Sequence, residues 1–465
     1  MNDILNALFS EIYMKQQNRI VLVLSSVMLF LAPVGLFSLG FKKIPQNQRT
    51  KFVAKRSPSR TNAAMVSKES YTAETLSFLH GRPSDLKVHH QMLMAQKETS
   101  YALVGNELAS IALIEGNEDL ARSLFLDAYR VMNDVSSFAW QEKKAQGIFF
   151  REDVKVYKGD PYEKMMNSLY LSLLLYKKGD IDNALACLKN AILVDSASED
   201  TIYNSDFAIL YALAARMERL RKSVHKAQEY EDKGIEEYFK MKNRWQKMQM
   251  DQKFQQSPFP LVYSEKGFRR IAQETGSMLL ICELGRGPVK YRTGRYGEEV
   301  KFAQVPRHIK RWSVLIDGEK VSSSRLSEGH NVFYQAVTRG GRKMDALLKQ
   351  KVSFKEGFNV LSTSVFTVAD KKKKKGKKDK ERGLKILGYL LQAASALTCP
   401  EADVRHWSLL PDEWMVVSLD LEPGEHLLEI EAYDAKGKRM KDSSVIKEFH
   451  ITGKRDVLFQ RIVRA

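Results

Sequence analysis

The sequence predicts a multidomain protein of the α plus β class, with an N-terminal transmembrane helix, an α-solenoid of helical repeats and a C-terminal β-sandwich-like domain that contains a helical insertion. Three observations predict it. An uncharged apolar run covers residues 20–41, two segments between residues 101 and 195 share one helical pattern, and the apolar period changes from 3.6 to 2 after residue 277. With 465 residues, 44% of them hydrophobic, the chain is long enough for two or three folded domains.

The first predicted element is the apolar run at 20–41, which follows an N-terminal segment at 1–19. Its 22 residues carry no charge, which is enough to cross a bilayer as a helix. Ser38 and Gly40 also suit a signal-peptide cleavage point, so the sequence leaves a signal sequence open beside a signal anchor. We expect an uncleaved anchor, because the preceding segment is long for a leader. The polar and basic stretch at 42–74 is predicted to be a tether.

Helical repeats are predicted between residues 75 and 256. Gly116 and Gly179 each interrupt a helical hairpin, and the small and large apolar residues around them fall at identical offsets. The repeat-packing positions are Leu108, Ala109, Gly116, Ala121, Phe125 and Ala128 in the first unit and Leu171, Gly179, Ala184, Leu188 and Ala191 in the second. Such hairpins cannot bury their own apolar faces and stack on neighbours, which predicts a binding scaffold.

A third unit at 206–237 keeps alanines at the expected positions but has no glycine at the turn, so we interpret it as a degenerate repeat. The pattern resembles the tetratricopeptide repeat. It departs from that repeat because the two glycines lie 63 residues apart, whereas the repeat length is about 34. A pair of ordinary amphipathic hairpins is the alternative.

A β-rich domain is predicted at 277–465. Short runs rich in β-branched and aromatic residues alternate there with turn residues, and 416–451 fits a β-meander of a sandwich. The apolar helix predicted at 384–398 is expected to pack on the sheet. The lysine-rich tract at 371–382 has nine basic and two acidic residues and is predicted to be a loop.

Three landmark segments appear in order along the chain: YKGDPYEKMMNSLYLSLLLYKKGDIDNAL, LLICELGRGPVK and EADVRHWSLLPDEWMVVSLDLEPGEHLLEI. In these the chain resembles an uncharacterised bacterial family of membrane-anchored or lipoprotein tetratricopeptide-repeat envelope proteins with a C-terminal β domain. The resemblance implies export and a non-enzymatic role. The chain departs from it by lacking a lipid-bearing cysteine and by adding the lysine tract. Positive charge after residue 41 favours a location of the folded domains in the cytoplasm. The resemblance implies the periplasmic or extracytoplasmic side of the membrane, and we expect the folded domains on that side.

Two segments supply candidate contacts with a partner or an anion, besides the lysine tract. The run from Gly285 to Pro288 follows a predicted strand and fits either a backbone anion nest or a tight turn. The segment at 405–407 fits either a ligand contact or internal packing, with the tryptophan under the β domain and the arginine paired with a carboxylate. The candidate residues are Arg286, Gly287, Lys371, Lys372, Lys373, Lys374, Lys375, Lys377, Lys378, Arg405 and Trp407.

The function predicted from these features is a non-enzymatic scaffold or adaptor, anchored to a membrane, that binds protein partners through its repeats. No catalytic, cofactor-binding or metal-binding residue is predicted, because HExxH, GxSxG, phosphate-loop and dinucleotide motifs are all missing from the sequence. The alternative is an electrostatic tether that binds anionic lipid or nucleic acid through its lysines, with nucleic acid disfavoured because no aromatic residue is interleaved. An enzyme whose residues converge only in space is the third hypothesis, and it requires a pocket with perturbed titratable groups.

Overall fold

The computed structural model describes residues 99–134, 155–196, 205–250, 265–273, 276–306, 309, 311–338, 343–374, 378–453 and 455–462. The chain divides into two compact units, 1–57 and 58–465, and every described residue belongs to the second. The predicted segments at 1–19, 20–41 and 42–74 therefore lie outside the described residues. Within those ranges no helix combines the length and apolarity that crossing a bilayer requires. This finding contradicts the predicted membrane-anchored architecture. The localisation that we inferred from that architecture is withdrawn with it.

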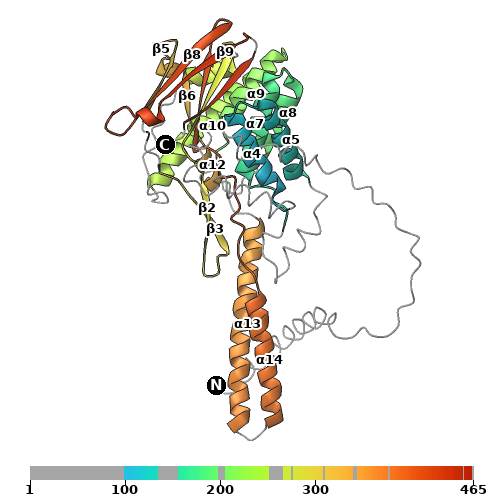
Figure 1. Ribbon diagram of the computed structural model, residues 1–465. Coiled ribbons are helices and arrows are strands. Elements are labelled where there is room, and N and C mark those ends of the chain that lie inside the picture. Colours follow the sequence, from blue (N-terminus) through green and yellow to red (C-terminus); the bar gives the residue numbers. More distant parts are fainter. Residues whose placement is uncertain are drawn as a thin grey trace, which may run out of the picture. The chain divides into compact units, whose positions relative to one another are not determined.

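The helical part is built from antiparallel helix pairs that pack on one another in chain order (Figure 1). The pairs are α4 (Tyr101–Ile114) with α5 (Glu118–Asn133), α7 (Pro161–Lys177) with α8 (Ile181–Ser196), and α9 (Ile209–Leu220) with α10 (Val224–Met250). Contacts between α5 and α7 and between α8 and α9 join consecutive pairs. The start of α7 is fixed by its sequence, because Pro161 fills the first helical position and Asp160 and Glu163 form a capping box.

The three pairs share one turn. Gly116, Gly179 and Lys222 occupy it with φ of 75°, 83° and 62°. In each turn this residue donates its amide to the carbonyl three residues earlier, and the next residue donates to the carbonyl five residues earlier, at 2.8 to 3.1 Å. A fully buried alanine follows each turn after five residues: Ala121, Ala184 and Ala227. The third unit thus keeps the turn geometry of the first two with lysine at the glycine position.

Replacing Lys222 by glycine is expected to raise the free energy of unfolding by about 1 kcal/mol. In the left-handed region of φ and ψ, the Cβ atom of a residue such as Lys222 crowds the following carbonyl oxygen, and glycine has no Cβ atom. The measurement is urea denaturation followed by circular dichroism. Gly179→Ala is the matched control and is expected to lower stability, since it creates the strain that Lys222→Gly removes. Equal stability of Lys222→Gly and the original chain would contradict this account of the turn.

The predicted tetratricopeptide solenoid is wrong. The turn residues lie 63 and then 43 positions apart, so the pairs do not form a regular array. The inner helices also lack an open concave face. Residues on every side of α7 are buried, because the β domain covers the side of this helix that a solenoid would leave open.

The described residues of the β domain form three sheets, with strand orders β10-β1-β7-β6, β5-β4-β8-β9 and β2-β3. The first sheet contains β1 (Met278–Leu284), β6 (Leu326–Asn331), β7 (Glu413–Leu419) and β10 (Asp456–Ile462). The second contains β4 (Arg311–Ile316), β5 (Glu319–Lys320), β8 (Gly424–Tyr433) and β9 (Val445–Ile451). The third is the hairpin of β2 (Val289–Thr293) and β3 (Glu299–Ala303). Helices α11 (Glu265–Ala272) and α12 (Val332–Thr338) lie between the helical pairs and the first sheet.

The first sheet lies between the helices and the second sheet. Leu279, Ile281 and Val416 point into the core shared with the helices, and Leu280 and Val417 into the core shared with the second sheet. This double burial explains why β1 and β7 are buried along their whole length and have large apolar residues at successive positions.

The predicted sandwich and its meander need correction. The first sheet is mixed, because β1 pairs parallel with β10 and antiparallel with β7. In 416–451, β8 and β9 form the expected hairpin, but β7 does not pair with β8. Strand β7 already has β1 and β6 on its two edges, so the chain crosses to the other sheet at the turn before Gly424.

The helical insertion is larger than predicted. Helices α13 (Lys343–Lys374) and α14 (Lys378–Leu397) form a long antiparallel pair, coloured orange in Figure 1. The tract at 371–382, predicted to be a loop, instead ends one helix and starts the other. The helix predicted at 384–398 packs on α13 and not on the sheet. Lysine is a strong helix former, which accounts for the first of these differences.

Candidate functional site

A segment of the same chain, residues 403–410, lies against the inner face of the helix pairs, which is the side of α4 and α7 that is turned toward the β domain. Trp407 is fully buried, and its ring centroid lies 5.7 Å from those of Phe125 in α5 and Tyr170 in α7. Its indole nitrogen donates to Ser110 Oγ at 3.1 Å, and its backbone amide to Glu163 Oε1 at 2.6 Å. Trp407 is therefore an internal packing residue and does not form an exposed partner contact.

Two carboxylates, one on α4 and one on α7, accept hydrogen bonds from the backbone of this segment. Glu107 in α4 accepts the amides of Ser408 and Leu409 at 2.8 and 3.2 Å, and also the Ser408 hydroxyl at 2.8 Å. Glu163 in α7 accepts the Tyr157 hydroxyl at 2.5 Å in addition to the Trp407 amide, and burial raises the pKa of this carboxyl. The groove that we predicted for a partner is thus filled and hydrogen-bonded from within.

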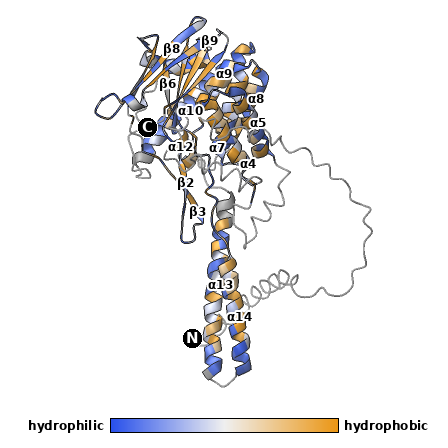
Figure 2. Ribbon diagram, viewed as in Figure 1, coloured by the Kyte–Doolittle hydropathy of each residue, from blue (hydrophilic) through white to orange (hydrophobic). Residues whose placement is uncertain are grey.

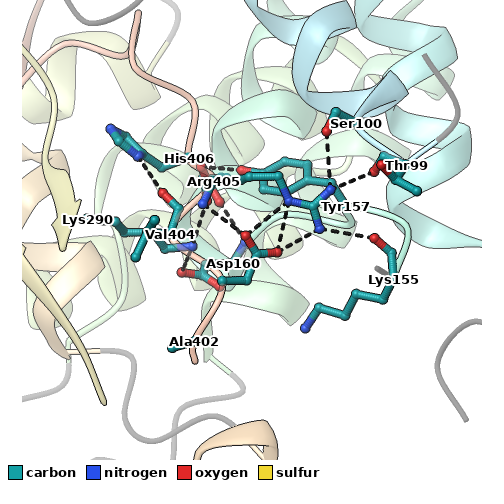
Figure 3. Close-up of polar contacts among 12 residues, drawn as sticks. Thr99, Ser100, Lys155, Tyr157, Asp160, Lys290, Ala402, Val404, Arg405 and His406 are labelled. Atoms are coloured by element: carbon teal, nitrogen blue, oxygen red, sulfur yellow. Dashed lines mark hydrogen bonds and ion pairs between the residues drawn. The ribbon is translucent and has the colours of Figure 1, made fainter. Parts of the chain in front are cut away.

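Arg405 fixes the start of the segment (Figure 3). Its guanidinium donates to the carbonyls of Thr99 and Lys155, each at 3.0 Å, and to Asp403 Oδ2 at 2.7 Å. It also lies 5.5 Å from the centroid of the Tyr157 ring. Burial alone would raise the pKa of Asp403, but the hydrogen bonds and charge of Arg405 hold it at about 2. Arg405 pairs with a carboxylate of its own chain.

The turn after β1 contacts the same segment. Gly287 donates its amide to the Leu410 carbonyl at 2.7 Å, and a Cβ at Gly287 would lie 2.7 Å from that oxygen. Gly285 has a φ of 69°, as expected of a tight turn. Arg286 between them is partly buried. The amide of Gly287 is committed within the chain, so the turn interpretation fits the geometry and the anion nest does not.

The predicted repeat-packing residues lie in the helical core. Leu108, Ala109, Phe125 and Ala128 of the first pair are fully buried, as are Leu171, Ala184, Leu188 and Ala191 of the second. They hold the helix pairs together and leave none of these side chains for a partner.

The hairpin of α13 and α14 has an unusual seam between its helices. The residues buried there include small and polar ones at regular spacing: Ser362 and Ala369 lie seven apart in α13, and Gly388 and Ser395 lie seven apart in α14. At the far end from the turn, Lys355 donates to the carbonyls of Ser395 and Thr398 at 2.8 and 3.0 Å. The spacing of seven is that of a coiled coil, and the small Gly388 makes room in the seam for the ring of Phe366.

Some large apolar residues of this hairpin face outward. On α14, Ile386, Leu390 and Leu397 are 62%, 53% and 63% exposed. Each lies two positions from a seam residue, which places it about 200° around the helix, on the side opposite α13. We call these three residues the outer stripe. On α13, Phe354, Val360 and Val368 are also exposed.

The predicted lysines lie at the turn of the hairpin, where Figure 2 shows hydrophilic residues gathered at the ends of both helices. Lys371, Lys372 and Lys373 belong to the last turn of α13, and Lys378 begins α14. Lys374 is helical, and Lys375 and Lys377 lie outside the described residues. Lys371, Lys373 and Lys378 are exposed.

A serine and a histidine that lie close together are enclosed in the core. Ser327 and His330 lie 2.9 Å apart, but both are 1% exposed and the imidazole packs against the rings of Phe207 and Tyr238. Burial lowers the pKa of His330 to about 3. Among the described residues, no group of histidine, cysteine, aspartate and glutamate could hold a metal ion.

No family model, curated protein or solved structure matches the chain. The resemblance to envelope proteins therefore stays a prediction, and the function is argued from the geometry alone. Sequence reasoning missed the outer stripe, although the 4- and 7-residue spacing of Ile386, Leu390 and Leu397 was visible within the run that it assigned to a core helix.

Proposed function

We propose that this protein is a non-enzymatic scaffold or adaptor that binds another protein through the α13–α14 hairpin. The observation that carries the proposal is the arrangement of α14: Leu384, Leu387 and Leu391 are at least partly buried in the hairpin, whereas Ile386, Leu390 and Leu397 point away from α13. A helix with apolar residues on two opposite sides has two faces to bury, and α13 covers only one.

The helix pairs and the β domain have a different part in this proposal. Because residues 403–410 fill the inner face of the pairs, the two parts support each other and form a rigid base. Contacts near the start of the hairpin include an ion pair of 3.1 Å between Arg295 and Glu356, and the Lys355 ammonium lies 5.5 Å from the centroid of the Tyr296 ring. The base thus presents the hairpin, and the hairpin binds the partner.

A photo-crosslinking amino acid placed at Leu390 is expected to form adducts with a second protein in the cells that make the chain. The same amino acid at Thr363, an exposed residue on the polar side of α13, is the control and is expected to form none. Adducts at Leu390 should disappear when Leu397 is changed to glutamate, because a charge in the stripe removes apolar contact. Equal adduct formation at both positions, or none at Leu390, would contradict the proposal.

The lysines give a second candidate function, an electrostatic tether for anionic lipid or nucleic acid. The observation that favours it is the gathering of Lys371, Lys373 and Lys378 at one end of the hairpin. Such binding would weaken steeply with salt and would not depend on the outer stripe. Sensitivity to Leu390→Glu therefore distinguishes the scaffold from the tether.

A further inference from the structure

The hairpin carries half of the net charge of the chain. Residues 343–397 contain fourteen basic and five acidic side chains, a net charge of +9 out of +18 for the whole sequence. The exposed basic residues next to the outer stripe are Lys378, Lys380 and Arg382, at the start of α14. Lys385, one turn further on, is paired with Glu381 at 2.8 Å.

These basic residues lie where a helix favours negative charge. The amino-terminal end of a helix carries a partial positive charge, so Lys378, Lys380 and Arg382 are unfavourable there, and Asp379 and Glu381 offset them only in part. An acidic group brought to this end from outside would interact favourably both with the side chains and with the helix dipole.

The outer stripe has the geometry of a helix-binding surface. Ile386, Leu390 and Leu397 follow each other at intervals of four and seven residues, the spacing that one helix presents to another. From Ile386 to Leu397 the stripe extends roughly 16 Å along the axis, about three helical turns. A partner helix of three or more turns would cover it.

A second copy of this chain fits the surface poorly. If two hairpins packed on their outer stripes in parallel, the two lysine-rich ends would meet. If they packed antiparallel, each lysine-rich end would lie beside residues 390–397 of the other α14, which carry no charge. Neither arrangement supplies the acidic groups that the basic end favours.

We propose that the outer stripe of α14 binds an amphipathic helix of another protein, whose apolar side covers Ile386, Leu390 and Leu397 and whose acidic residues lie beside Lys378, Lys380 and Arg382. This inference rests on the proposed scaffold function and adds the chemistry of the partner. The apolar stripe supplies affinity, and the basic end selects an acidic helix over a basic one.

The test uses the full chain and two fluorescent probe peptides of three heptads. Both carry leucines in an apolar stripe, and they differ only in having glutamate or lysine at the flanking positions. Fluorescence anisotropy is expected to show at least about tenfold tighter binding of the glutamate peptide. Leu390→Glu is expected to weaken that binding by about tenfold or more, as is the triple change of Lys378, Lys380 and Arg382 to glutamate. Thr363→Glu is the matched control and is expected to bind normally.

The outcomes separate this inference from the proposed function. Equal binding of the two peptides that Leu390→Glu abolishes would overturn the acidic partner and leave the docking surface in place. Binding that is insensitive to Leu390→Glu would overturn both. Sedimentation that shows a dimer of the original chain and a monomer of Leu390→Glu would overturn the inference in favour of a second copy. Because Leu390 is 53% exposed, its substitution is expected to leave the fold intact, which circular dichroism would check.

Discussion

Replacing Trp407 by alanine is expected to lower the free energy of unfolding by about 3–5 kcal/mol. The side chain is fully buried between the helix pairs and the first sheet, where it contacts Phe125 and Tyr170 and where its indole nitrogen donates to Ser110. Removing the ring leaves a cavity lined by groups from both parts of the protein. Guanidinium denaturation followed by circular dichroism would measure the loss.

Trp312→Ala is a matched control for this prediction. Trp312 is only partly buried, in β4, and it packs at the border of the core between the two sheets. We expect its substitution to destabilise the protein less, because fewer buried contacts are lost. If both changes had the same small effect, below about 1 kcal/mol, the segment at 403–410 would not hold the helix pairs to the β domain in the way that its contacts indicate.

The second large effect is expected for Arg405→Leu, which should destabilise the protein by about 3–5 kcal/mol. The substitution leaves the Asp403 carboxylate buried without its counter-charge and also leaves the carbonyls of Thr99 and Lys155 without the guanidinium donors. The double variant Asp403→Asn with Arg405→Leu is expected to be more stable than Arg405→Leu alone, because it removes the unpaired charge. No recovery in the double variant would show that the ion pair is not the main contribution.

The same pair predicts how stability depends on pH. The pKa of Asp403 is about 2 in the folded protein and close to 3.8 when unfolded, so its contribution is complete above 3.8 and is lost as the pH falls through about 2. The difference corresponds to roughly 2 kcal/mol. Denaturation between pH 5 and pH 2 should therefore show a shallower loss of stability for Asp403→Asn than for the original chain. Equal slopes would contradict the lowered pKa.

The helical hairpin turns are the part of the fold that the sequence shows most directly. Glycine is the residue that takes positive φ without strain, so Gly116 and Gly179 mark their turns in the sequence, whereas Lys222 adopts the same φ without any such signal. The apolar run of β1 predicts a strand, but periodicity contains no information on its parallel partner 178 positions later along the chain.

The candidate site was harder to predict for a physical reason. The segment at 403–410 is held in part through backbone amides that bond to Glu107 and Glu163, and backbone groups are the same in every sequence. The lysine tract was predicted to be a loop from its charge, although lysine is a good helix former and the tract continues two helices. The apolar residues of α14 were assigned to a core because hydropathy alone does not distinguish the seam of a hairpin from its outer side.

The parallel pairing of β1 with β10 has a consequence for the order in which the protein folds during synthesis. The helix pairs leave the ribosome first, but their inner face is covered only when residues 403–410 and then β10 emerge, hundreds of residues after α4. At a rate of about 5–20 residues per second, the apolar side of these helices stays exposed for roughly 15 seconds or longer. We therefore expect nascent chains of this protein to expose this apolar surface to chaperones until β10 has been made.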